Sequence, residues 1–123
     1  MNERTVAELQ AEIERLMLVL GDRSIYEDDT EPKPSRDALV TAAFILSGLS
    51  DHFRNNCEIE PFWGQLSLIW RSGLEKRVKA TFGGDGTLSI YHERMAGGRV
   101  VDSGMEVTHG PAGSVLAERL AWL

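Results

Sequence analysis

The sequence lacks most of the features that identify secreted, membrane-bound or metal-dependent proteins. Cys57 is the only cysteine among 123 residues, so the chain can form no internal disulfide and no cysteine pair for a metal. The longest uncharged stretch, residues 38–50, is shorter than the about 20 residues that span a bilayer. The first residues lack the apolar segment of a signal peptide. We therefore expect a cytoplasmic protein with no membrane segment, metal or cofactor.

Basic residues are also scarce where a nucleic-acid-binding protein would need them. The net charge is −6. Residues 1–32 contain nine acidic and three basic residues, whereas residues 33–123 contain ten of each. Binding to a phosphate backbone requires clustered lysine and arginine. We therefore do not expect nucleic acid as a partner, and we assign the acidity to an N-terminal element.

Residues 1–21 predict an amphipathic helix of the coiled-coil kind. Thr5 and Glu8 have the spacing of a capping box, and Gly21 stands where a left-handed C-cap would end the helix. The spacing of 3 and 4 residues between apolar positions creates a seam. Its members are Val6, Leu9, Ile13, Leu16 and Leu20. The seam can pack on the helix's own domain, or pair with a partner helix or with a second copy in a homodimer.

Residues 22–35 are rich in acidic residues and proline, which predicts a flexible acidic linker. A globular domain then covers residues 36–123. Its first element is a helix over residues 35–53 that begins at a Ser35 cap and can break near Gly48. Because this helix is apolar on nearly all sides, we expect it to be a central packing element.

From Glu58 onward, apolar and polar residues alternate, which predicts short antiparallel strands joined by glycine-rich turns. A closing helix begins near Pro111. The fold class is therefore α+β, a meander of about four or five strands covered by two helices. The predicted inner face consists of Leu66, Leu68, Trp70, Val78, Ala80, Phe82, Leu88 and Ile90.

Residues 83–87 read GGDGT, the letters of the phosphate-binding loop of NAD kinases and diacylglycerol-type lipid kinases. In those enzymes the loop leads into a helix, whose N-terminus holds phosphate. Here residues 87–92 alternate like a strand, and Asp85-Gly86 is a strong hairpin signal. We therefore predict a hairpin turn at this position.

No catalytic motif is evident in the sequence. The alternative of a small enzyme or ligand-binding domain would require a concave pocket that holds His52, Cys57 or His92 beside other polar groups. A cysteine–histidine nucleophile formed by Cys57 and His52 is conceivable there. Phe62 and Trp63 lie between Pro61 and Gly64, which favours an aromatic contact site in a loop or at a strand entry.

Residues 58–123 contain the stretches IEPFWGQLSLIW, RVKATFGGDGTLSIY and ERLAWL. They resemble small bacterial and mobile-element proteins of unknown function that share an L-x-W strand, a D-G hairpin and a closing L-x-W-L helix. The resemblance implies a binding role, such as that of an antitoxin-like or phage-borne inhibitor. We expect a non-enzymatic module that binds a target protein and uses its N-terminal helix for docking or self-association.

Overall fold

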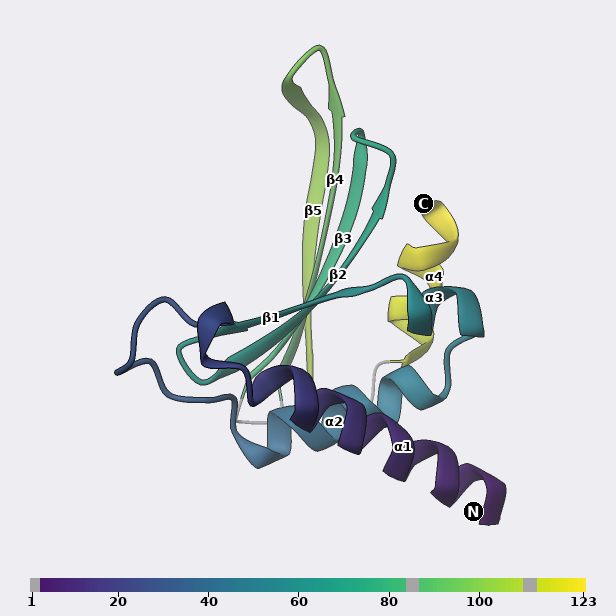
Figure 1. Ribbon diagram of the computed structural model, residues 1–123. Helices are drawn as coiled ribbons and strands as arrows, with labels where there is room; N and C mark the ends of the chain where they lie inside the picture. The colour runs from purple at the N-terminus through teal and green to yellow at the C-terminus, as the bar shows by residue number, and fades with distance from the viewer. Residues whose placement is uncertain (1–2, 84–86, 110–112) are drawn as a thin grey trace.

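The computed structural model describes residues 3–83, 87–109 and 113–123 (Figure 1). One antiparallel sheet contains five strands in chain order, each paired with the next. The strands are β1 (Glu58–Phe62), β2 (Gln65–Ser72), β3 (Lys76–Phe82), β4 (Thr87–Ala96) and β5 (Arg99–His109). The predicted meander and α+β class are confirmed.

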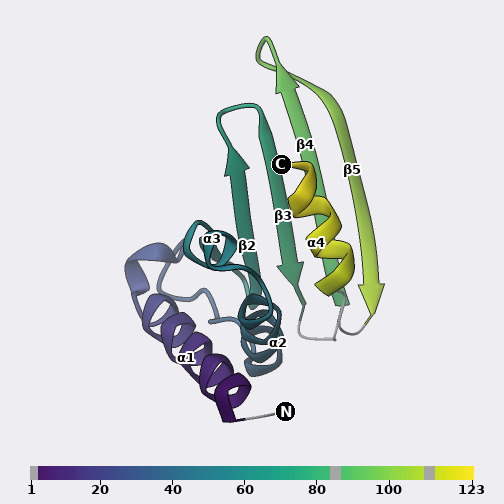
Figure 2. The same ribbon diagram turned by 90° about the vertical axis from the view of Figure 1, so that its right-hand side faces the viewer.

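The helices lie at one end and on one face of this sheet. They are α1 (Glu3–Leu20), the short 3₁₀ helix η1 (Arg23–Ile25), α2 (Arg36–Ser47), α3 (Asp51–Asn55) and α4 (Gly113–Trp122). Figure 2 shows α4 in front of β3 and β4, while α1 and α2 lie together at the other end of the molecule. Among the residues described, no helix has the length and apolarity needed to cross a membrane.

The helix predicted over residues 35–53 is present as two helices separated near Gly48. Ser35 caps α2, because its hydroxyl accepts a hydrogen bond from the Ala38 N–H at 3.2 Å. The closing helix is present as α4, but Pro111, its predicted first residue, lies outside the described residues. The core between α2, α4 and the sheet buries all eight apolar side chains of the predicted inner face.

The seam of α1 also contributes to this core. Leu16 and Leu20 are buried, and Leu9 and Ile13 are half-buried against the same cluster. Val6, nearest the start of the helix, is half exposed. The sequence left open whether the seam packs on its own domain or pairs with another helix. In this structure it packs within the chain, against α2. The core therefore includes side chains from both sides of the predicted boundary at residue 35.

The helix ends at Leu20, directly before Gly21 as predicted, but both predicted caps are wrong. The helix already includes Glu3, so Thr5 lies within it and not at its N-cap. Gly21 does not have the positive φ of a left-handed C-cap. Its N–H instead donates to the Met17 carbonyl at 3.0 Å, which continues the helical pattern for one residue before η1 begins.

The GGDGT segment connects two paired strands. Phe82 of β3 pairs with Leu88 of β4, and the Gly83 N–H donates to the Thr87 carbonyl at 3.1 Å. A strand, not a helix, follows the loop, so the helix N-terminus on which the kinase-type phosphate loop depends is missing here. The flanking strands confirm the hairpin, while Asp85 and Gly86 themselves lie outside the described residues.

Candidate interaction site

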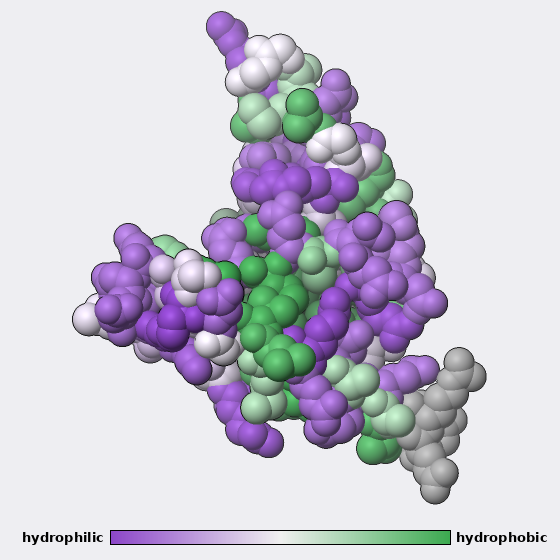
Figure 3. All heavy atoms as spheres, viewed as in Figure 1, coloured by the Kyte–Doolittle hydropathy of each residue, from purple (hydrophilic) through white to green (hydrophobic). Residues whose placement is uncertain are grey.

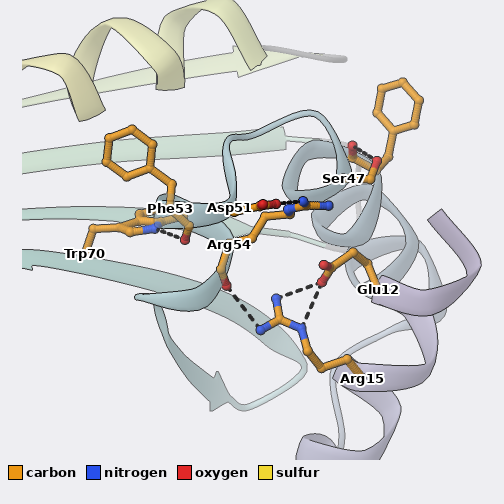
Figure 4. Close-up of polar contacts among 8 residues, drawn as sticks. Glu12, Arg15, Ser47, Asp51, Phe53, Arg54 and Trp70 are labelled. Atoms are coloured by element: carbon orange, nitrogen blue, oxygen red, sulfur yellow. Dashed lines mark hydrogen bonds and ion pairs between the residues drawn. The ribbon is translucent and has the colours of Figure 1, made fainter. Parts of the chain in front are cut away.

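An arginine fixes α1 to the rest of the molecule beside the core (Figure 4). The Arg15 Nε donates to the Glu12 carboxylate at 2.9 Å, and its Nη1 donates to the Arg54 carbonyl of α3 at 3.1 Å. The Trp70 indole of β2 in turn donates to the Phe53 carbonyl at 2.8 Å. These bonds connect α1, α3 and β2, so α1 is a structural part of the fold and not a detached arm.

Phe62 and Trp63 lie at the turn between β1 and β2. Phe62 pairs with Gln65, which leaves only Trp63 and Gly64 to connect the strands. Trp63 has φ 45° and Gly64 has φ 90°, the signs that a type I′ turn requires at both positions. Glycine and asparagine adopt this backbone easily, but tryptophan does so at a cost. Trp63 is the only non-glycine residue with positive φ in the part of the chain that the structure describes.

A buried carboxylate holds Trp63 in this conformation. Only 3% of Glu31 is exposed. Its Oε2 accepts the backbone N–H of Trp63 at 3.1 Å, and its Oε1 accepts the backbone N–H of Glu27 at 2.8 Å. The neighbouring Ser35 N–H donates to the Gly64 carbonyl at 3.2 Å. Both residues of the turn are therefore bonded to the segment that precedes α2.

The aromatic side chains at this turn remain accessible even though the backbone is fixed. Phe62 is 55% exposed and Trp63 is 44% exposed. The Trp63 indole N–H donates to Glu27 Oε2 at 2.8 Å, which orients the ring beside a carboxylate. We call Phe62 and Trp63 the aromatic tip. It combines two accessible rings with a defined backbone and an acidic neighbour, the properties of a contact site for another protein.

The acidic segment, residues 22–35, differs from the predicted flexible linker, because its polar side chains bond to its own backbone. Arg23 Nη2 donates to the carbonyls of Asp28, Asp29 and Glu31. Tyr26 is buried, and its hydroxyl donates to the Leu20 carbonyl at 2.7 Å. High charge predicted disorder here, but these local and tertiary bonds order the segment.

Two aspartates stabilise turns within the acidic segment. The Asp22 carboxylate accepts from the Ser24 hydroxyl and N–H, and the Asp28 carboxylate accepts from those of Thr30. These hydrogen bonds lower the pKa of both carboxyl groups below 3.8. Burial raises the pKa of Tyr26, so its hydroxyl stays protonated and continues to donate.

Of the three residues named for the alternative ligand site, His52 lines a cavity. His52 lines a cavity of about 430 Å³ together with Phe53, Trp70 and Leu120, but neither Cys57 nor His92 lines it. Cys57 is half-buried, and burial raises the pKa of its thiol, which disfavours the nucleophilic thiolate. His92 packs its ring on Trp122, with a centroid distance of 5.1 Å.

Within the described residues, no group of three or more His, Cys, Asp or Glu side chains could hold a metal ion. The sequence also failed to single out Glu27 and Glu31, although both hold the aromatic tip. Their charge alone suggested exposure, and only the folded arrangement brings them to Trp63.

The sequence matches no described protein family, no curated protein and no solved structure. The resemblance of residues 58–123 to mobile-element proteins therefore stays a prediction, and the candidate site rests on the geometry of the chain itself.

Proposed function

We propose that this chain is a non-enzymatic cytoplasmic module that binds a target protein through the aromatic tip, Phe62 and Trp63. The observation that carries this proposal is the backbone of Trp63. A tryptophan with positive φ costs about 1–3 kcal/mol in general, and such costs concentrate where a site must be organised in advance. Asparagine or glycine would form the same turn without that cost.

The surroundings of the aromatic tip favour a target with a basic and apolar surface. Glu27 bonds the indole, and Asp28 and Asp29 follow it on the same exposed segment. In Figure 3 this acidic segment is a largely hydrophilic projection on the left, beside apolar side chains that gather where β1 passes α1. An inhibitor or antitoxin-like protein would use such a combination to cover a basic functional surface of its target.

The N-terminal helix can contribute to docking only through side chains that the core does not use. Pairing through Leu16 and Leu20 would require both residues to leave the core. In the described part of α1, the large apolar side chains that are exposed are those of Val6, Met17 and Leu18. Docking through α1 would therefore involve these three residues instead of the whole predicted seam.

Affinity capture from the source organism, with quantitative comparison of variants, tests the proposal. The double variant Phe62→Ser/Trp63→Asn removes both rings and keeps a residue suited to the turn. Leu74→Ser is the matched control, because Leu74 is 99% exposed on a different turn. Loss of an aromatic anchor typically costs about 2 kcal/mol or more in binding. We expect one target to be retained by the wild type and the control and lost with the double variant.

The salt dependence of capture gives a second readout. If the target surface is basic, retention should weaken as ionic strength rises, since exposed charges are screened. Equal capture by all three proteins would contradict a role for the aromatic tip.

The cavity beside His52 supports a second candidate, a ligand-binding domain. Its volume of about 430 Å³ falls within the range of small-molecule sites. A ligand that raises the melting temperature of the wild type but not of a His52→Ala variant would favour this candidate.

A further inference from the structure

The β2–β3 and β4–β5 turns lie side by side at one end of the sheet. The Met95 N–H donates to the Glu75 carbonyl at 2.7 Å, which joins the second hairpin to the first. We call the two turns and the strand ends beside them, residues 71–76 and 94–102, the hairpin end. Figure 1 and Figure 2 both show it pointing away from α1 and α2. The aromatic tip is at the opposite end of β2, so the two surfaces are separate.

The hairpin end exposes aliphatic side chains. Leu74, in the middle of the β2–β3 turn, is 99% exposed, and Val100 and Val101 of β5 are each 50% exposed. Removing such side chains from water is favourable. They differ from the residues that dominate protein–protein contacts, which are enriched in tryptophan, tyrosine and arginine and poor in leucine and valine. Because Leu74 protrudes, a partner that accepts it needs either a matching pocket or a fluid apolar interior.

The hairpin end is basic, while the remainder of the chain is acidic. It contains four basic and two acidic residues, whereas the rest of the sequence contains nine basic and 17 acidic residues. The six charged residues of the hairpin end are Arg71, Lys76, Arg94, Arg99, Glu75 and Asp102. An anionic surface would therefore attract this end of the molecule and repel the rest.

Two of the four cations are free to meet such a surface. An ion pair holds Arg71, and a hydrogen bond to a backbone carbonyl holds Lys76. Arg94 and Arg99 are exposed, and neither guanidinium has a hydrogen-bond or ion-pair partner among the residues described. The carboxylate of Asp102 approaches the ring of His92, at 4.0 Å, and forms no ion pair with either of these arginines.

We infer that the hairpin end binds the surface of an anionic membrane. The aliphatic side chains enter the boundary between headgroups and acyl chains, and the two free guanidiniums lie beside lipid phosphates. Exposed apolar area combined with basic residues is the combination that holds proteins on anionic bilayers. A bilayer accepts a protruding leucine without a preformed pocket. This orientation leaves the aromatic tip turned away from the membrane, where it stays accessible to a protein.

Co-sedimentation of the full chain with vesicles tests the inference. We expect binding to vesicles of equal parts phosphatidylcholine and phosphatidylglycerol, weakening as ionic strength rises, and none to pure phosphatidylcholine. Arg94→Gln/Arg99→Gln should lower the partition coefficient by about tenfold or more. Lys33→Gln/Arg36→Gln removes the same charge at exposed positions of the other end and should not lower it.

The aliphatic contribution is tested in the same assay. Leu74→Ser should lower the partition coefficient by about fivefold or more. Leu18→Ser is the matched control, because Leu18 is 80% exposed on α1, and it should have no effect. Leu74→Ser should still retain the protein target of the aromatic tip, so the two proposals can fail independently.

Three results would overturn the inference. The first is a wild-type chain that does not sediment with the anionic vesicles, or that sediments equally with both kinds. The second is an equal effect of the hairpin-end variants and their controls. The third is a protein target that is lost with Leu74→Ser while the vesicles stay unbound, because the hairpin end would then be a protein contact.

Discussion

The two edges of the sheet are built in opposite ways. β1 has five residues, including Pro61 and the charged Glu58 and Glu60, all of which discourage pairing with another strand. The helices α1 and α2 and the acidic segment lie at its end of the molecule (Figure 1). β5 has eleven residues, and the described helix beside it is α4, whose Arg119 pairs with Glu106 of β5 (Figure 2).

The difference teaches that the two edges are suited to different kinds of contact. At β1 proline and charge discourage pairing, and hydrogen bonds to the buried Glu31 carboxylate fix one turn that exposes two aromatic side chains. At β5 one side of the backbone is free of strand pairing, and the exposed side chains include the apolar Met105 and Val107 beside the charged Arg99 and Asp102. The first arrangement favours recognition by side chains, and the second favours strand addition.

The largest expected effect concerns the helix that supports the β1 end. Leu16→Ala should lower the free energy of unfolding by about 2–5 kcal/mol, because it leaves a cavity in the core. Leu18→Ala, on the exposed side of the same helix, should change it by less than about 0.5 kcal/mol. Denaturant unfolding of both variants measures the difference. Equal effects would mean that α1 is not part of the core.

A smaller effect should follow from loss of the carboxylate that holds the aromatic tip. Glu31→Ala leaves the N–H groups of Glu27 and Trp63 without their partner and should destabilise the fold by about 2 kcal/mol. Glu118→Ala, at an exposed position of α4, is the control and should change stability by less than about 0.5 kcal/mol. Chemical shifts of the Trp63 indole would report whether the turn loosens. A stable Glu31→Ala variant with an unchanged Trp63 signal would contradict the role of Glu31.

The turns of the acidic segment should make the β1 end sensitive to acid. Asp22 and Asp28 have a lower pKa in the folded protein than the ordinary 3.8. Their contribution is therefore fully present above that value and is lost as the pH falls through the lower folded pKa. The melting temperature should drop as the pH falls below about 4, and less so in an Asp22→Asn/Asp28→Asn variant, which has no carboxyl group to protonate there. An identical drop in both proteins would mean that groups other than Asp22 and Asp28 cause the acid sensitivity.

Much of the sheet could be predicted from the sequence, because burial on one face imposes the alternation of Leu66, Leu68 and Trp70 directly. The Ser35 cap was also predictable, since a helix start needs a side-chain acceptor. The ordered conformation of the acidic segment could not be predicted, because it depends on hydrogen bonds from Arg23 to backbone carbonyls that only the fold brings together. The strained backbone of Trp63 could not be predicted either, because nothing in the sequence PFWG indicates that the tryptophan has a positive φ.

The melting temperature of Trp63→Asn tests the central claim most directly, that the tip holds a costly residue in order to bind. Asparagine adopts the left-handed conformation easily, so we expect the melting temperature to stay the same or rise. The free energy of unfolding should increase by up to about 1 kcal/mol. Phe62→Ser should be nearly neutral as a matched change at the neighbouring exposed position. A Trp63→Asn variant that melts well below the wild type would contradict the account, because Trp63 would then be needed for the fold itself.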